Sequence, residues 1–186
     1  MEAFLVSTGI VALAEMGDKT QLLSLVLAAR FRKPWPIVAG ILAATLANHA
    51  GAAAVGHWIT TMLGPDVLRW ILAISFLAMA AWILVPDKLD DDESATANRF
   101  GVFGATTVAF FLAEMGDKTQ IATVALAAQY TSMWGVVAGT TFGMMLANVP
   151  VVFLGDKLVK RVPIRVVHMI AAAIFALLGL GALIVR

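Results

Sequence analysis

Nine residues of this chain occur twice in identical form, and each copy lies inside a long apolar stretch. Residues 13–21 and 112–120 both read Leu-Ala-Glu-Met-Gly-Asp-Lys-Thr-Gln, at an offset of 99 positions. A charged group at the centre of a bilayer costs about 3 kcal/mol or more, so such groups rarely persist there without a function. The repeated motif therefore predicts a chain of two related halves with a polar site inside a membrane.

The composition also indicates a membrane protein. Of the 186 residues, 61% are hydrophobic and 13% are charged, and there is no cysteine, whereas soluble domains are about 45–50% apolar and about 25% charged. A membrane-spanning helix needs about 20 mostly apolar residues. Six segments meet this requirement, and we expect an all-α integral membrane protein in a lipid bilayer. The expected spans are about 4–29, 36–58, 68–85, 101–128, 134–154 and 166–185.

The repeat extends beyond the motif and divides the chain. At the same offset Trp35 matches Trp134, and after a slip of one residue Asn48 matches Asn148. The single long polar run, rich in aspartate, lies between the two copies. We predict a first three-helix repeat over 1–86, an acidic linker over 87–100 and a second three-helix repeat over 101–186.

Loop charges predict the orientation of the two halves. If the six spans alternate, one side carries nine basic residues and the other carries two; the remaining two, Lys19 and Lys118, lie inside spans. Basic loops stay in the cytoplasm, which places the linker there and both termini outside, in a bacterial inner membrane. Three spans per half then make the second copy inverted, an architecture of many secondary transporters. The nine are Arg30, Arg32, Lys33, Lys88, Arg99, Lys157, Lys160, Arg161 and Arg165, against Arg69 and Arg186.

Both motif copies offer hard oxygen ligands, which suit Mn²⁺, Ca²⁺ or Mg²⁺. A glutamate and an aspartate three residues apart share one helix face, and the glycine between them permits close backbone approach or a local break in the helix. The expected primary ligands are four carboxylates, and neutral oxygens from the motifs and from the second and fifth spans support them. The primary set is Glu15, Asp18, Glu114 and Asp117; the supporting set is Thr20, Gln21, Thr119, Gln120, Asn48 and Asn148.

Charge balance suggests what the site carries. Four carboxylates against Lys19 and Lys118, if both are protonated, leave a net charge of −2. One divalent cation neutralises this charge, and so do two protons when the cation leaves, because uncompensated buried charge is expensive. The hypothesis is therefore an exchanger of a divalent cation for protons. The two lysines act as counter-ions in this interpretation, or alternatively extend away from the site.

The three histidines are interpreted as packing or interface residues. His49 follows Asn48, but its repeat counterpart is Val149, so it cannot belong to a symmetric site. His57 and His168 lie near the ends of spans. We expect no resident cofactor and no nucleic-acid partner; the cation and the protons are substrates, and the oligomeric state is left open.

The pattern Glu-x-Gly-Asp-Lys-Thr, present as residues 15–20 and 114–119, resembles the signature of uncharacterised protein family 0016. That family includes transmembrane protein 165 and the yeast GDT-type Golgi transporters, and the resemblance covers essentially the whole chain. It implies a Ca²⁺/Mn²⁺ transporter that exchanges the cation for protons, with the motif acids as ligands. Bacterial members of this size resemble manganese exporters.

Three other interpretations compete with this one. Intramembrane aspartyl proteases place aspartates in helices, one within Gly-x-Gly-Asp, but Glu15 stands where the first glycine of that sequence would be, and no His-Glu-x-x-His signature is present. A non-transporting structural or assembly protein of the membrane is the second. A transporter of another solute is the third.

Overall fold

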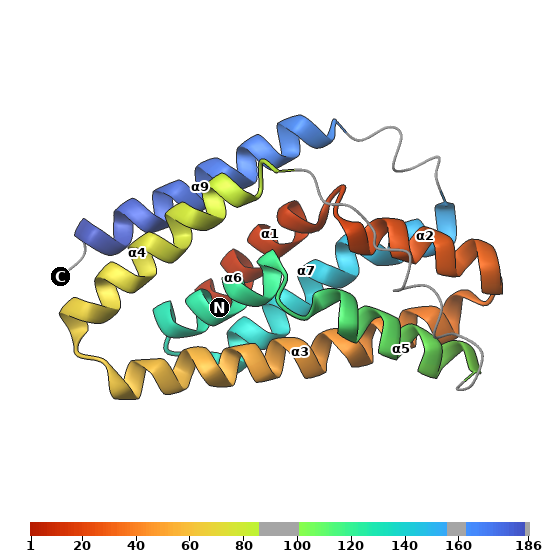
Figure 1. The fold of residues 1–186 in the computed structure, drawn as a ribbon, viewed down its shortest axis with the longest axis horizontal. Helices are drawn as coiled ribbons and strands as arrows, with labels where there is room; N and C mark the ends of the chain where they lie inside the picture. The colour runs from red at the N-terminus through yellow and green to blue at the C-terminus, as the bar shows by residue number, and fades with distance from the viewer. Residues whose placement is uncertain (86–100, 156–162, 185–186) are drawn as a thin grey trace.

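The computed structural model describes residues 1–85, 101–155 and 163–184, and all regular structure in these residues is helical (Figure 1). The expected linker over 87–100 lies outside them. Within the described residues there are eight helices, and four of them are long and apolar enough to cross a membrane. The helices are α1 (Glu2–Glu15), α2 (Lys19–Phe31), α3 (Pro34–Met62), α4 (Pro65–Trp82), α5 (Gly101–Glu114), α6 (Lys118–Gln129), α7 (Met133–Leu154) and α9 (Ile164–Ile184).

The first and fourth expected spans are not single helices. Each is divided at its motif, α1 from α2 and α5 from α6. Gly17 has φ +83° and Gly116 has φ +76°, a left-handed conformation that glycine adopts without the steric cost of a side chain. A helix of 14 residues rises about 21 Å and cannot cross a hydrocarbon core of about 30 Å by itself. The local break that the motif glycine permits is therefore present at both places, and each of these two expected spans consists of two shorter helices.

Two crossings of closely packed helices hold the halves together. α1 runs along α7, and α5 runs along α3. The two crossings depend on glycines: a Cβ added at Gly139 would lie 2.5 Å from the carbonyl oxygen of Phe4, and one added at Gly40 would lie 2.9 Å from that of Phe103. Small residues allow helix backbones in membranes to approach this closely. Each crossing joins a helix of one half to a helix of the other.

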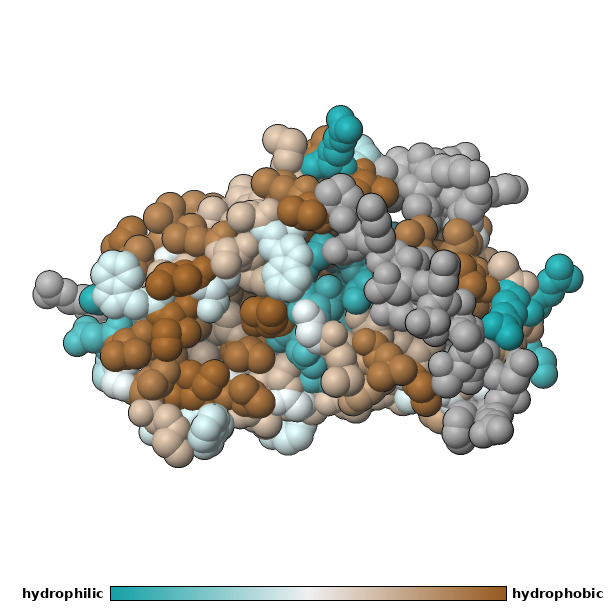
Figure 2. Space-filling view, in the orientation of Figure 1, coloured by the Kyte–Doolittle hydropathy of each residue, from teal (hydrophilic) through white to brown (hydrophobic). Residues whose placement is uncertain are grey.

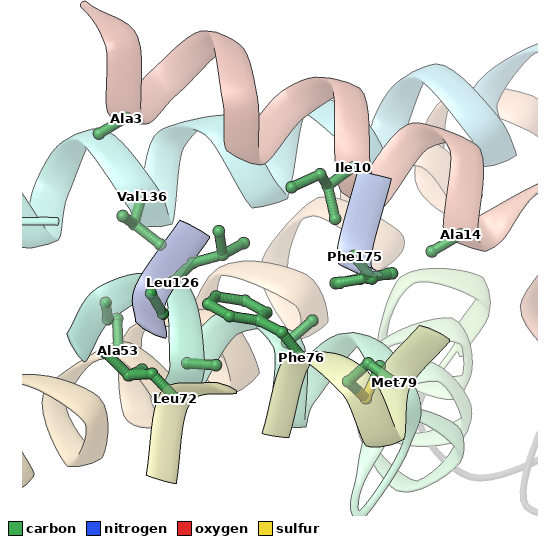
Figure 3. Packing of buried hydrophobic residues seen from close by; sticks show 14 of the residues in the cluster. Ala3, Ile10, Ala14, Ala53, Leu72, Phe76, Met79, Leu126, Val136 and Phe175 are labelled. Carbon is green, nitrogen blue, oxygen red and sulfur yellow. The ribbon is translucent and has the colours of Figure 1, made fainter. Parts of the chain in front are cut away.

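α4 and α9 form a separate layer over one side of this core (Figure 1). Phe76 of α4 and Phe175 of α9 are fully buried, and their ring centroids lie 6.3 Å apart. Figure 3 shows both rings between α1 and α6, beside Ile10 and Leu126. The outer layer is therefore anchored on the first short helix of one half and the second short helix of the other.

The outer surface is largely apolar. Figure 2 shows brown side chains over much of one face, with a teal region recessed near its middle. Large apolar side chains such as Trp58, Trp70 and Leu177 are exposed, Leu177 by 69%. Exposed apolar area on this scale would promote aggregation in water, but it suits the hydrocarbon of a bilayer. The structure is that of an integral membrane protein.

Candidate functional site: a buried carboxylate cluster

Both motifs build the same local structure. After the glycine, Asp18 and Asp117 take extended backbone angles, φ −79° and −80° with ψ 168°, and become the N-caps of α2 and α6. Asp is a preferred residue at this position, but here neither aspartate side chain makes a capping hydrogen bond to the first turn. The motif therefore ends one helix, turns left-handed at glycine and starts the next helix at aspartate.

The motif glutamines stabilise these two breaks. The Gly17 N–H donates to Gln21 Oε1 at 2.9 Å, and the Gly116 N–H donates to Gln120 Oε1 at 2.8 Å. A backbone N–H group that leaves the hydrogen-bond ladder of a helix is satisfied here by a side chain of the same motif. Gln21 and Gln120 were predicted as supporting metal ligands; in the structure their Oε1 atoms accept hydrogen bonds from the backbone at the two helix breaks.

The motif threonines orient the glutamates. The Thr20 hydroxyl donates to Glu15 Oε2 at 2.5 Å, and the Thr119 hydroxyl donates to Glu114 Oε2 at 3.0 Å. The other oxygen, Oε1, of each glutamate is buried and has no hydrogen-bond partner among the described residues. Each glutamate is thus fixed through one oxygen and presents the other, and the arrangement is the same in both halves.

Three motif carboxylates from the two halves converge. Oxygens of Glu15, Glu114 and Asp117 all lie within 4.8 Å of one another, and all three residues are buried. Two oxygens on opposite sides of a cation, each about 2.4 Å from it, lie about 4.8 Å apart. The spacing therefore suits ligands of one divalent cation, and none of the three residues could form this cluster within its own half.

The fourth motif acid has a different partner. Lys118 Nζ lies 3.3 Å from Asp18 Oδ1, and both side chains are only 2% exposed. The pair crosses between the halves, whereas Lys19, the counterpart of Lys118, is partly exposed. The two motifs thus differ in how deeply this lysine is buried, and Asp18 is paired with a cation of the protein itself.

The two asparagines form hydrogen bonds that join helices. Asn148 Oδ1 accepts from the Ser24 hydroxyl at 2.8 Å. Asn48 Nδ2 donates to the Phe111 carbonyl at 3.0 Å, and Asn48 Oδ1 lies 3.5 Å from Gln120 Nε2. These contacts place both amides next to the motif helices, bound to protein groups. Sequence analysis missed Ser24, since a single serine in an apolar helix carries no distinctive signal.

The histidines lie in three different environments. His49 is fully buried, and neither ring nitrogen has a hydrogen-bond partner among the described residues. His57 is exposed on α3. His168 Nε2 lies 2.6 Å from the carbonyl oxygen of Met16, inside the first motif. The position of His168 near the end of a span concealed this contact from the sequence.

The chain is similar to known cation transporters. The family model described as divalent cation/proton antiporter GDT1 matches residues 3–91 and 102–185. A protein of Vibrio cholerae named "Putative manganese exporter" is 53% identical over 97% of this chain and 90% of its own length. A GDT1-like protein of Synechocystis is 27% identical over 95% and 94%, and one of Arabidopsis thaliana is 26% identical over 99% and 96%.

No solved structure matches the chain. The family model covers nearly the whole of it, in two segments that each contain one copy of the motif. The family consists of transporters and not of enzymes. The chain belongs to the divalent cation/proton antiporter GDT1 family, and its activity is cation transport across a membrane.

Proposed function

We propose that this protein exchanges a divalent cation, Mn²⁺ or Ca²⁺, for protons and exports it from the cytoplasm. The observation that carries the proposal is the convergence of Glu15, Glu114 and Asp117 within 4.8 Å of one another in buried surroundings. Three carboxylates in a space of low dielectric repel one another unless a cation or protons compensate them. The same groups therefore serve as cation ligands and as proton carriers.

The remaining motif residues keep this cluster in place. Thr20 and Thr119 hold the glutamates, and Gln21 and Gln120 hold the breaks. Lys118 offsets Asp18, which joins the ligand set when the lysine withdraws. Asn48 and Asn148 lie next to the motif helices. Together with the motif threonines and glutamines, they orient the carboxylate ligands and supply neutral oxygens while the cation passes.

Six spans in two inverted repeats support movement across the bilayer. The short pairs α1/α2 and α5/α6 each act as one span, with the break at mid-membrane. Arg30, Arg32 and Lys33 lie in and beside the connection of α2 to α3, at the end where α5 begins, and Arg69 lies toward the other end (Figure 1). This distribution of charge supports a cytoplasmic end at α2–α3 and a bacterial inner membrane.

Uptake into proteoliposomes tests the proposal. We expect Mn²⁺ or Ca²⁺ to move faster with an imposed pH gradient than without one, and each cation transported to be accompanied by proton movement in the opposite direction. Glu15→Gln and Glu114→Gln should each abolish the flux, because each removes a ligand and a proton carrier. Glu2→Gln is the control, since Glu2 is exposed at the start of α1.

The same assay separates the competing interpretations. A cation flux that does not change with the pH gradient refutes proton exchange. Full flux in Glu15→Gln refutes the assignment of the carboxylate cluster as the cation site. Divalent cation at 100 times its dissociation constant should stabilise the folded protein by about 2.7 kcal/mol. If another solute stabilises the protein and divalent cations do not, the protein transports that solute instead. If the glutamate variants change neither flux nor metal tolerance, the protein has a structural or assembly function.

A further inference from the structure

The start of α9 covers the first motif. A Cβ added at Gly17 would lie 2.6 Å from Ile164 Cγ2. One turn farther along α9, His168 Nε2 lies 2.6 Å from the Met16 carbonyl oxygen. An N–H at this nitrogen donates a hydrogen bond to that carbonyl, which lies just after the end of α1. α9 thus holds the first break through one apolar contact and one hydrogen bond.

Among the residues that the structure describes, none covers the second motif in this way. A Cβ added at Gly116 would meet no atom within 4 Å among the described residues, and Met115 is 56% exposed. The two motifs are identical in sequence and nearly identical in backbone. The difference between them therefore comes from α4 and α9, and not from the motifs.

α4 and α9 are related by the same offset of 99 as the motifs. Four identities support this register: Val67 with Val166, Ile71 with Ile170, Ala73 with Ala172 and Phe76 with Phe175. The last pair packs ring against ring at the contact between the two helices (Figure 3). In this register the counterpart of His168 is Arg69, the counterpart of Ile164 is Pro65, and the counterpart of Met16 is Met115.

The packing of α4 and α9 on the core is one-sided. α9 packs on α1 and α4 packs on α6, whereas neither makes an extended contact with α2 or α5 among the described residues (Figure 1). In inverted repeats, exchanging the conformations of the two halves converts one state into the state that faces the opposite side. This exchange would move α9 from α1 onto α2, and α4 from α6 onto α5.

We propose that Arg69 is a positioning residue of the opposite state, in which it donates to the Met115 carbonyl as His168 donates to that of Met16. The inference rests on the proposed exchange, which needs two such states. Arg69 is suited to this exchange of partners: its contact with Asp66 is 3.6 Å long, Asp66 is 93% exposed, and the buried Arg69 Nε has no hydrogen-bond partner among the described residues. The five N–H donors of arginine suit capture of a carbonyl.

Cross-linking of introduced cysteines tests the two positions, since the natural chain has none. The full chain in lipid vesicles is treated with a short bis-thiosulfonate reagent. Met16→Cys with Ile164→Cys reports the state seen here, and Met115→Cys with Pro65→Cys reports the opposite one. Both pairs leave His168 and Arg69 intact. We expect both pairs to link, each in a fraction of the molecules.

The control pair is Met115→Cys with Val67→Cys. Val67 is two residues from Pro65, so it lies on another face of α4, and it should not link. If the pair at 16 and 164 links and the pair at 115 and 65 does not, α4 does not reach the second motif and the proposal is wrong. This readout needs no transport, so its failure is distinct from failure of the cation/proton exchange.

The part played by Arg69 has its own readout. Arg69→Ala should lower linking at 115 and 65 and raise linking at 16 and 164, each by about two- to tenfold, the effect of one net hydrogen bond on the ratio of the states. His168→Ala should change both yields in the opposite direction, and Arg69→Lys should restore them. A merely structural residue would lower both yields together, and that result would overturn the proposal.

Discussion

At the scale of single residues, identical sequences have different electrostatic environments. Lys118 is buried against Asp18 at 3.3 Å, while Lys19 is partly exposed. A buried ion pair depends on both partners, because removal of one leaves an uncompensated charge in surroundings of low dielectric. From the sequence, the two lysines were interpreted alike, either as counter-ions or as side chains that extend away from the site. Their different burial predicts that they contribute unequally to stability.

Lys118→Met should lower the free energy of unfolding by about 3–5 kcal/mol, because it leaves the Asp18 carboxylate buried without its ammonium partner. Lys19→Met should cost less, since Lys19 is only partly buried. The measurement is the thermal midpoint of the purified protein in detergent without divalent cation. Adding Asp18→Asn to Lys118→Met should recover most of the loss. Equal losses for the two lysine variants would contradict the inequality.

At the scale of elements, the helix breaks are positions at which local sequence and tertiary packing both act. Gly17 and Gly116 share a left-handed backbone, and the motif alone accounts for that. The surroundings differ, since Ile164 lies against Gly17, whereas a Cβ added at Gly116 meets no atom of the described residues within 4 Å. Substituting each glycine in turn therefore separates two effects: backbone strain, which both positions share, and a clash with α9, which occurs only at Gly17.

Gly116→Ala should destabilise the protein by about 1–2 kcal/mol, the cost of a side chain in the left-handed region. Gly17→Ala carries the same strain and also displaces the Ile164 side chain from the first break. It should therefore lower the thermal midpoint further than Gly116→Ala does. The comparison is made in one detergent at one pH. If Gly116→Ala were the more harmful of the two, α9 would not press on the first motif.

At the scale of the whole molecule, the proposed inverted arrangement predicts that the connection of α2 to α3 and the connection of α6 to α7 lie on opposite sides of the membrane. Single cysteines at Lys33 and at Thr131 should react with a membrane-impermeant thiol reagent from opposite faces, Lys33 from the cytoplasm and Thr131 from outside. These residues lie between α2 and α3 and between α6 and α7. The natural chain contains no cysteine that would interfere. Labelling of both positions from one face would refute the inverted topology.

Much of the element content could be predicted from the chain. The four long helices α3, α4, α7 and α9 lie close to expected spans because apolar length is a local property. The two broken spans were predicted as continuous segments, although the motif glycines allowed a break. Hydropathy averages over a window and does not register a single residue at φ +83°, so the division into half-helices required the structure.

The chemistry of the site could also be predicted from local sequence, because it resides in two copies of a nine-residue motif. Charge, ligand type and the likeness to a transporter family follow from side chains and their spacing, which do not depend on the rest of the fold. Glu15 lies about 100 positions before Glu114 and Asp117 in the chain, and the crossings of α1 with α7 and of α5 with α3 bring the oxygens of all three together. Convergence of this kind is a long-range property.

The sequence by itself determined a membrane protein of two related halves, each with one acidic motif, and the family to which it belongs. Tertiary structure alone decided that Lys118 and not Lys19 is buried with Asp18, and that α9 covers the first motif and not the second. It also showed that the motif threonines donate hydrogen bonds to the glutamates, and that the motif glutamines accept hydrogen bonds from the backbone at the helix breaks. The physical reason is that two identical motifs have identical local preferences. Any difference between them must come from the helices packed against them.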